Sequence, residues 1–313
     1  MRVLVTGANG FAGRHVIDHL LQTTDWRIAA VDVTLPERDG DPRIDRYVFD
    51  LRNPVPESRN FGNTDVVINL AASSDVTSFF EDPYRHVLNN VAITLNLLQW
   101  SLTQDLQMFI QVSTNEVYGP TDAVLSREWD PLIPATPYSA SKAAQEMLAI
   151  AWHQSLATPT VVINTSHLFG ERQPMTKFIP TAVKKILRNE SVPIYGRRLG
   201  PDPWEASIRN WTYVGNFAHA LAYVIERGTN GYVDRWNVAG PVMNCEEVAD
   251  GVADLVGLPL SIEWQDSGEA RPGYEHHYAL DPAAFERYGF VPYYGFDEGL
   301  KRTVDWYVER LQK

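Results

Sequence analysis

The sequence predicts an α/β protein, with a doubly wound parallel sheet followed by a smaller C-terminal α/β lobe. Short β-branched runs alternate with segments of helical spacing through about residue 163, which is typical of parallel strands joined by crossover helices. A glycine-rich turn separates the first run from the first helix. The chain has 313 residues, of which 44% are hydrophobic and 21% charged, so it can form two packed lobes.

Composition limits the partners of this protein. The chain has 27 Lys and Arg against 39 Asp and Glu, a net charge of −12, which disfavours nucleic acid and anionic lipid but allows a small anion held by a few arginines. The single cysteine, Cys245, excludes a disulfide framework and a Cys-rich zinc site. No apolar run approaches the roughly 18 residues of a membrane span, and a strand begins directly after Met1, which leaves no room for a signal sequence. We therefore expect a cytoplasmic protein.

A glycine turn joins the first predicted strand, Arg2–Thr6, to a helix over Arg14–Gln22. Its first glycine allows a tight turn, the second lets the backbone approach a pyrophosphate, and the third lets helix and strand pack closely. The positive end of the helix would stabilise the phosphates. The spacing is Gly-x-x-Gly-x-x-Gly, and it predicts a Rossmann dinucleotide site. We assign to this site Gly7, Asn9, Gly10, Phe11 and Gly13.

An acidic residue follows the second predicted strand, Trp26–Val31. Asp32 stands where a carboxylate accepts hydrogen bonds from the hydroxyls of an adenosine ribose. A carboxylate there repels a 2′-phosphate, and the next residues, Val33 and Thr34, bring no arginine. The sequence therefore predicts NAD rather than NADP. The alternative is a solvated Asp at the end of a strand.

Two further strands, predicted at Arg46–Phe49 and Asp65–Leu70, are followed by residues that can approach the cofactor. Small residues after the second of these strands leave room for it. A long helix is predicted at Asp82–Thr103. From these segments we assign to the cofactor site Asp50, Leu51, Ala71, Ala72 and Asn90.

Candidate catalytic residues follow the fifth predicted strand, Met108–Val112, because ligands of a doubly wound sheet lie at the carboxyl ends of its strands. Thr114, Asn115 and Glu116 lie there. Farther along, a Tyr-x-x-x-Lys pattern opens a helix that runs to about Ser155.

Tyr138 and Lys142 of this pattern share one helix face. The ammonium group, with the positive charge of a nicotinamide, would stabilise the phenolate, so the tyrosine could act as a base near neutral pH despite an ordinary pKa of about 10. The alternative is a solvated helix face.

These motifs resemble the extended short-chain dehydrogenases/reductases, which are NAD-dependent nucleotide-sugar epimerases, decarboxylases and 4,6-dehydratases. The resemblance covers nearly the whole chain. Thr114, Tyr138 and Lys142 match the catalytic triad of that family. The best local matches are to the dTDP-glucose 4,6-dehydratase branch, with Ser113–Gly119 close to its Ser-Thr-Asp-Glu-Val-Tyr-Gly segment. Segments 177–180 and 271–281 also resemble this branch, whereas 209–214 resembles a pattern found across several branches of the family.

The resemblance implies a Rossmann domain over 1–165 and about 211–240, and a nucleotide-sugar lobe over 166–210 and 241–313. Lys177 would lie near the nucleotide, and Arg209 and Arg271 near the diphosphate. The alternative for each cation is an ordinary surface position. The implied substrate contacts are Ser74, Thr114, His167, Lys177, Arg209 and Arg271. The family also implies a homodimer in which the helices over 82–103 and 138–155 form an intersubunit four-helix bundle.

The implied reaction begins when Tyr138 takes the proton of the sugar 4-hydroxyl, while Thr114 hydrogen-bonds the same oxygen. Glu116 then removes the proton on C5, and water is lost from C5 and C6. Asn115 stands where the dehydratases have the Asp that protonates the leaving hydroxyl, and an amide cannot supply a proton by titration. Dehydration, 4-epimerisation and decarboxylation of a uronic acid therefore stay open, and so does a silent NAD-binding scaffold.

Other departures from the family pattern affect the sugar or phosphate pocket. Asn164 replaces a usual arginine, His167 replaces a phosphate-contacting Asn, and Ser73–Asp75 replaces Glu-Ser-His. The segment Arg197–Ser207 is rich in Gly, Pro and charge and predicts a loop. His15 and His19 stand at i, i+4 on a predicted helix but lack the Glu of a zinc-protease helix, so we expect no metal.

Overall fold

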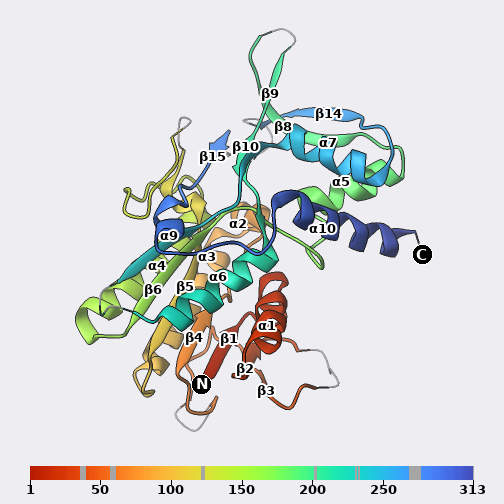
Figure 1. Ribbon diagram of the computed structural model, residues 1–313. Coiled ribbons are helices and arrows are strands. Elements are labelled where there is room, and N and C mark those ends of the chain that lie inside the picture. Colours follow the sequence, from red (N-terminus) through yellow and green to blue (C-terminus); the bar gives the residue numbers. More distant parts are fainter. Residues whose placement is uncertain are drawn as a thin grey trace.

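The computed structural model describes residues 1–35, 40–56, 61–120, 124–200, 203–229, 231, 233–267 and 276–312. A seven-stranded sheet with the order β12-β6-β5-β4-β1-β2-β3 forms its centre, and all neighbouring strands in it are parallel (Figure 1). The strands are β1 Arg2–Thr6, β2 Arg27–Asp32, β3 Ile44–Val48, β4 Val66–Asn69, β5 Met108–Thr114, β6 Thr160–Thr165 and β12 Asp234–Val238. The predicted doubly wound fold is confirmed.

Helices cover both faces of this sheet. The helices of this lobe are α1 Phe11–Thr23, α2 Val76–Glu81, α3 Pro83–Ser101, α4 Pro137–Leu156 and α6 Val214–Arg227. Along β1, Val3 and Val5 pack with α1 and α6, whereas Leu4 packs with α3 and α4 on the opposite face. This alternation is the period of two that a strand imposes. None of the described helices is both long and apolar enough to span a bilayer.

Local signals in the sequence set where the helices begin. Thr136 caps α4: its hydroxyl accepts from the Ser139 backbone N–H, and the Ser139 hydroxyl accepts in turn from the Thr136 backbone N–H, which forms a capping box. Pro137 occupies the first turn, where its missing N–H costs nothing. The cap places Tyr138 at the very start of α4, beside the carboxyl end of the sheet.

A second lobe has its own apolar core, formed around Val183, Val248 and Val304. Its helices are α5 Phe178–Leu187, α7 Cys245–Val256 and α10 Phe296–Leu311, whereas α9 Ala283–Arg287 packs on β12 and places Phe285 in the core of the first lobe. The strands of the second lobe are β7 Leu168–Phe169, β8 Val192–Arg198, β9 Trp204–Ala206, β10 Ile208–Asn210, β11 Thr212–Tyr213, β13 Val242–Asn244, β14 Ile262–Asp266 and β15 His277–Tyr278. They form sheets of only two or three strands, in contrast to the large central sheet.

The prediction of a loop over 197–207 is wrong for residues 197–198 and 204–206, which lie in strands. Strands β8 and β9 pair antiparallel there and project from the second lobe as a hairpin (Figure 1). Arg197 and Glu205 form an ion pair at 2.5 Å across the two strands, and the Trp204 ring lies parallel to that of Trp264 with centroids 5.8 Å apart. Cross-strand pairs of this kind stabilise a hairpin despite its Gly and Pro content.

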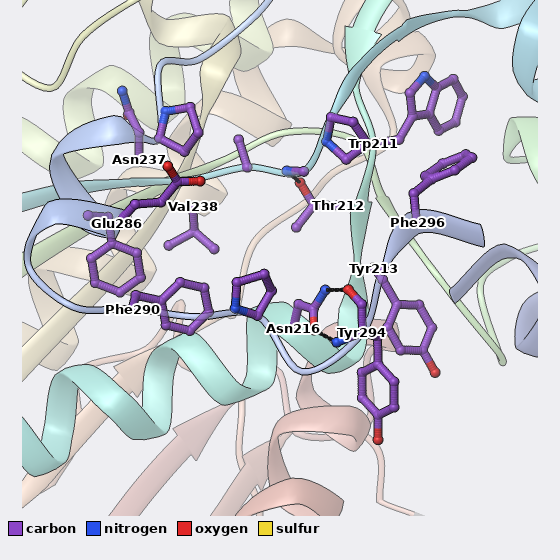
Figure 2. Close-up of a pocket in the computed structure, with 17 residues that line it drawn as sticks. Trp211, Thr212, Tyr213, Asn216, Asn237, Val238, Glu286, Phe290, Tyr294 and Phe296 are labelled. Atoms are coloured by element: carbon purple, nitrogen blue, oxygen red, sulfur yellow. Dashed lines mark hydrogen bonds between the residues drawn. The ribbon is translucent and has the colours of Figure 1, made fainter. Parts of the chain in front are cut away.

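The two lobes are joined by specific polar contacts. The guanidinium of Arg172 binds the Asp18 carboxylate at 2.8 Å. Asn216 of α6 donates to the Tyr294 carbonyl at 2.8 Å and accepts from the Tyr294 N–H at 3.0 Å (Figure 2). A cavity of about 170 Å³ lies at this junction, lined mainly by apolar side chains such as Phe290. No predicted catalytic residue lines this cavity, so the candidate active site is elsewhere.

Candidate active site

The glycine turn is a cradle of backbone atoms with no room for side chains. Gly7 has a φ of 63°, and its carbonyl accepts from the Gly10 N–H at 2.9 Å. A Cβ on Gly13 would lie 2.2 Å from the Gly7 oxygen, and one on Gly7 would lie 3.0 Å from the Ala71 nitrogen. The turn opens directly into α1, whose free N–H groups and dipole suit a pyrophosphate. These residues therefore fit NAD, and Phe11 is the first residue of that helix.

Asp32 lies at the end of β2, next to the glycine turn. One of its carboxylate oxygens accepts from the Asn9 N–H at 2.9 Å, and the other from the Thr34 N–H at 3.3 Å. The Arg14 guanidinium donates to the Asn9 side-chain oxygen at 2.7 Å. Arg14 is therefore a cation beside this turn that the sequence argument did not consider, because it examined only the residues adjacent to Asp32.

The other predicted cofactor residues lie along the same edge of the sheet. Leu51 is buried, whereas Asp50 is partly exposed and pairs with Arg52 at 2.5 Å, and that guanidinium lowers the pKa of the Asp50 carboxyl. The Ala71 N–H donates to the Thr6 hydroxyl at 3.1 Å, directly beside Gly7, and Ala72 follows it. Their contribution to cofactor binding stays a prediction.

Thr114 is the last residue of β5, and its hydroxyl organises the turn that follows. It accepts from the Glu116 N–H at 3.3 Å and donates to the Asn115 side-chain oxygen at 3.2 Å. Asn115 is only 3% exposed, and its Nδ2 has no hydrogen-bond partner among the described residues. A buried N–H without a partner is costly, so this amide is available to donate to a ligand.

Tyr138 faces this turn from the start of α4, with its ring edge-on to Phe79 of α2 at 5.4 Å. Burial raises the pKa of Tyr138 above its ordinary value, the nearby charge of Glu116 adds to this effect, and a hydrogen bond with Thr114 opposes it. The phenol is therefore protonated in the protein alone. The stabilisation of the Tyr138 phenolate by Lys142 stays a prediction.

Lys142 is buried, and two oxygen atoms accept hydrogen bonds from its ammonium group. Its Nζ donates to the Val112 carbonyl and to the Gln145 side-chain oxygen, each at 2.7 Å. Burial lowers its pKa to about 8, and the charge of Glu146 opposes this effect. The two hydrogen bonds thus fix the ammonium group at the carboxyl end of β5, but the lowered pKa means that it loses its proton at a lower pH than an exposed lysine does.

A polar network that the sequence argument missed ties α3 to α4. Gln145 donates from Nε2 to the Asn90 carbonyl at 2.9 Å and to the Thr94 hydroxyl at 2.8 Å. Asn90 is fully buried and donates in turn to the Ser141 hydroxyl at 2.9 Å. The sign of this network in the sequence is the position of Gln145, which stands three residues after Lys142 and therefore shares its helix face. Asn90, predicted as a cofactor contact, supports the helix that carries Lys142.

The predicted substrate residues do not all lie together in the structure. Arg209 is 1% exposed, and its Nη1 donates to the carbonyls of Ile208 and His276 at 2.6 and 2.7 Å. His167 has a φ of 33°, and its ring lies 5.8 Å from that of Trp211, two residues beyond Arg209. The structure therefore brings the segments of His167 and Arg209 together.

Three predicted substrate residues stand apart from this pair. Lys177 is exposed and precedes the first residue of α5, and Ser74 is exposed before α2. Arg271 lies outside the described residues. Contact of any of the six predicted substrate residues with a sugar nucleotide stays a prediction.

Comparison with known proteins agrees with this geometry. dTDP-glucose 4,6-dehydratase 1 of Escherichia coli is 32% identical over 348 residues, covering 100% of this chain and 94% of that protein. The structure of DesIV, a dTDP-glucose 4,6-dehydratase from Streptomyces venezuelae with NAD bound, superposes with a TM-score of 0.87 at 29% identity, covering 99% and 97% of the two chains.

An epimerase is also similar. UDP-N-acetylglucosamine 4-epimerase of Methanobrevibacter ruminantium, in complex with UDP-N-acetylmuramic acid, gives a TM-score of 0.86 at 26% identity, covering 99% of this chain and 98% of that one. The family model of the NAD dependent epimerase/dehydratase family matches residues 3–239. The resemblance that the sequence motifs indicated is thus confirmed. The chain belongs to the NAD dependent epimerase/dehydratase family, and it is an NAD-dependent enzyme.

Proposed function

We propose that this protein is a nucleotide-sugar 4,6-dehydratase that acts on a dTDP- or UDP-hexose. The observation that carries the proposal is the placement of a second base beside the tyrosine. Glu116 lies close enough to Tyr138 for its charge to raise the pKa of the phenol, and Thr114 hydrogen-bonds both residues. A single oxidation and reduction of C4 needs only one base, whereas elimination across C5 and C6 needs a second. The similarity to dehydratases supports the same reading.

The residues that would hold NAD are the glycine turn, Asp32, the Ala71–Ala72 segment and Lys142. When bound, NAD supplies the acceptor for the hydride of C4 and returns that hydride at C6. Its positive charge would add to that of Lys142 beside the phenol, and opposite charge nearby lowers the pKa of an acid. Tyr138 then removes the proton of the 4-hydroxyl, and Thr114 donates a hydrogen bond to the same oxygen.

Glu116 carries out the elimination in this proposal. The ketone at C4 acidifies the proton on C5, which the Glu116 carboxylate removes. The hydroxyl on C6 leaves with a proton, and the protonated Glu116 can return the one that it has just taken, which releases one water. When the hydride returns to C6, C5 takes up one proton, and this uptake balances the proton that Tyr138 removed from the 4-hydroxyl and releases at the end of the cycle. Asn115 donates a hydrogen bond from its unpartnered Nδ2 to the oxygen on C6 and so orients the leaving group.

The amide of Asn115 also favours a second candidate function. A 4-epimerase or a UDP-glucuronate decarboxylase needs no acid for a leaving hydroxyl, and Asn115 cannot supply one by titration. The similarity to a 4-epimerase supports this alternative.

Product analysis separates these functions. The protein is incubated with dTDP-glucose, UDP-glucose and UDP-glucuronate, and the products are followed by mass spectrometry and NMR. A dehydratase yields a 4-keto-6-deoxy sugar lighter by one water. Unchanged mass with inverted C4 identifies an epimerase instead, and release of CO2 from UDP-glucuronate identifies a decarboxylase.

The control for this experiment is Tyr138→Phe, which removes the phenol oxygen and keeps the ring against Phe79. Loss of a general base reduces turnover by about 10²–10⁴-fold, while NAD binding is expected to persist. Full turnover in Tyr138→Phe would contradict the assigned role. Absence of turnover in the wild-type protein with every sugar nucleotide tested would favour the silent scaffold.

We also propose that the protein is a homodimer. The outer faces of α3 and α4 expose Tyr84, Leu88 and Met147, with 77%, 47% and 45% of their surfaces accessible. Exposed large apolar side chains on two packed helices are typical of a subunit interface. Sedimentation velocity tests this: Leu88→Glu is expected to shift a dimer to monomer, and a wild-type monomer would overturn the proposal.

A further inference from the structure

A buried ion pair lies one helical turn beyond Lys142. Glu146 is fully buried and Arg235 is 4% exposed, and the Glu146 Oε2 and the Arg235 Nη2 are 2.5 Å apart. The guanidinium also lies over the Tyr118 ring, 5.0 Å from its centroid. A buried pair is expensive to form, because both charges lose their hydration, so its presence beside the candidate site calls for a role.

Asn164 connects this pair to the catalytic strand. Its Nδ2 donates to the Glu146 Oε1 at 2.7 Å and to the Thr114 carbonyl at 3.3 Å, and its Oδ1 accepts from the Arg235 Nε at 3.1 Å. The Asn164 amide therefore uses its donors and acceptor to join three elements. The Thr114 backbone, at the point where β5 ends, is one of its partners.

Sheet geometry explains how Arg235 reaches this position. Strands β12, β6 and β5 are neighbours, and Asn164 on β6 is paired with Asn237 on β12 and with Ser113 on β5. Arg235 lies two residues before Asn237 and so shares its face of the sheet. The long side chain of Arg235 can thus extend from β12 across β6 and reach the side chain of Asn164.

The pair also affects the charge of Lys142. Of the charged groups around Lys142, Glu146 on the same helix raises the pKa of the ammonium, against the larger effect of burial. Burial raises the pKa of Glu146 in turn, while Arg235 on β12 and Lys142 lower it. Arg235 therefore opposes the effect of burial on Glu146, and the charged form of Glu146 favours the ammonium form of Lys142.

We propose that Glu146 is a positioning residue of this enzyme and that Arg235 keeps it in place. Glu146 orients Thr114 through Asn164, and it maintains the charge of Lys142 on the adjacent helical turn. The inference rests on the proposed function only in taking Thr114 and Lys142 as catalytic. It holds equally for a dehydratase, an epimerase and a decarboxylase.

The test compares Glu146→Gln, Arg235→Met and the double variant, all checked for fold by circular dichroism. Glu128→Gln is the matched control, because Glu128 is a buried acid of the same region whose carboxylate accepts from the Asn237 N–H at 3.2 Å. The first measurement is the pKa of Lys142 in the cofactor-free protein, from the carbon-13 NMR signal of its Cε. The second is the pH profile of kcat with the sugar nucleotide that the wild-type protein converts.

In Glu146→Gln we expect the pKa of Lys142 to fall below its wild-type value, and kcat to decrease by about tenfold with an unchanged KM, as for a group that acts in the transition state. The decline of kcat at high pH should begin at lower pH. In the double variant stability should recover, because no charge is left unpaired, but the shifted pH profile should remain. Arg235→Lys should recover most of the rate lost in Arg235→Met.

A merely structural pair gives a different result. If the double variant regains both stability and the wild-type pH profile, or if Glu128→Gln shifts the Lys142 signal as much as Glu146→Gln does, the proposal is overturned. Because the NMR measurement needs no substrate, failure of the proposed dehydratase function leaves that measurement intact.

Discussion

The cofactor half and the substrate half of the site differ in how far the protein satisfies its own polar groups. On the cofactor side, Lys142, Gln145 and Asn90 hydrogen-bond one another and the backbone around them. At the carboxyl ends of β5 and β6, where we propose that the substrate binds, Asn115 Nδ2 and Thr165 Oγ1 are buried and have no partner among the described residues. The cofactor half is therefore preorganised by the chain itself, whereas the substrate half keeps hydrogen-bonding capacity for a ligand.

The largest effect is expected from filling the cradle of the cofactor half. In Gly13→Ala the new methyl group would meet the Gly7 oxygen at 2.2 Å, a distance that forces the turn apart. We expect NAD affinity to fall by about a thousandfold or more, since close backbone approach is what the turn provides. Calorimetric titration with NAD measures this. Gly295→Ala is the control, because a Cβ there meets no atom within 4 Å, and wild-type affinity in Gly13→Ala would contradict the assignment.

A pH effect on stability should reveal the cost of preorganisation. The pKa of Lys142 is about 8 in the folded protein and 10.5 ordinarily. Between these values the unfolded chain binds a proton that the folded protein lacks, so the free energy of unfolding rises with pH there. The rise amounts to about 3 kcal/mol at most, and it is complete above the ordinary pKa. Urea unfolding of wild-type protein and Lys142→Met across this range should show the slope only in the wild type. Parallel curves would argue against a depressed pKa.

The smallest effect concerns the substrate half and sharpens the choice of reaction. Asn115→Asp introduces a carboxyl group in a buried position, where desolvation raises its pKa and keeps it protonated. If the reaction is a dehydration, this acid should increase its rate by about tenfold, a modest part of what general acids contribute. Rates of water loss from dTDP-glucose in the two proteins provide the measurement. An epimerase or decarboxylase should gain nothing from this change.

The cofactor half could be predicted from the sequence because its signals are local. The glycine turn, Asp32 and the Tyr138–Lys142 spacing each fall within a few residues of a predicted strand end or helix start, and the fold and family that they indicated are confirmed. The residue-by-residue roles remain predictions. The rise in the pKa of Tyr138 that burial causes depends on the surrounding fold, and the Tyr138–Lys142 spacing does not indicate it.

Contacts between segments that are far apart in the chain could not be predicted from such local signals. Glu146 and Arg235 are 89 residues apart in the chain and meet only because β12 returns to the edge of the sheet beside β6. Asn164 stood out in the sequence as a departure from the family pattern, but the sequence did not indicate its contact with Arg235, which lies on a neighbouring strand. The hairpin over 197–207 was missed because Gly and Pro content indicates a turn and says nothing of the strands on either side.

The placement of Arg235 has a consequence for which substitutions the chain can tolerate. Loss of the guanidinium alone would leave the Glu146 carboxylate buried without its cation, and loss of the carboxylate alone would leave a buried guanidinium without its anion. Breaking such a pair costs about 3–5 kcal/mol, a large share of the roughly 5–15 kcal/mol that keeps a protein folded. Positions 146 and 235 are therefore expected to tolerate replacement together better than one at a time.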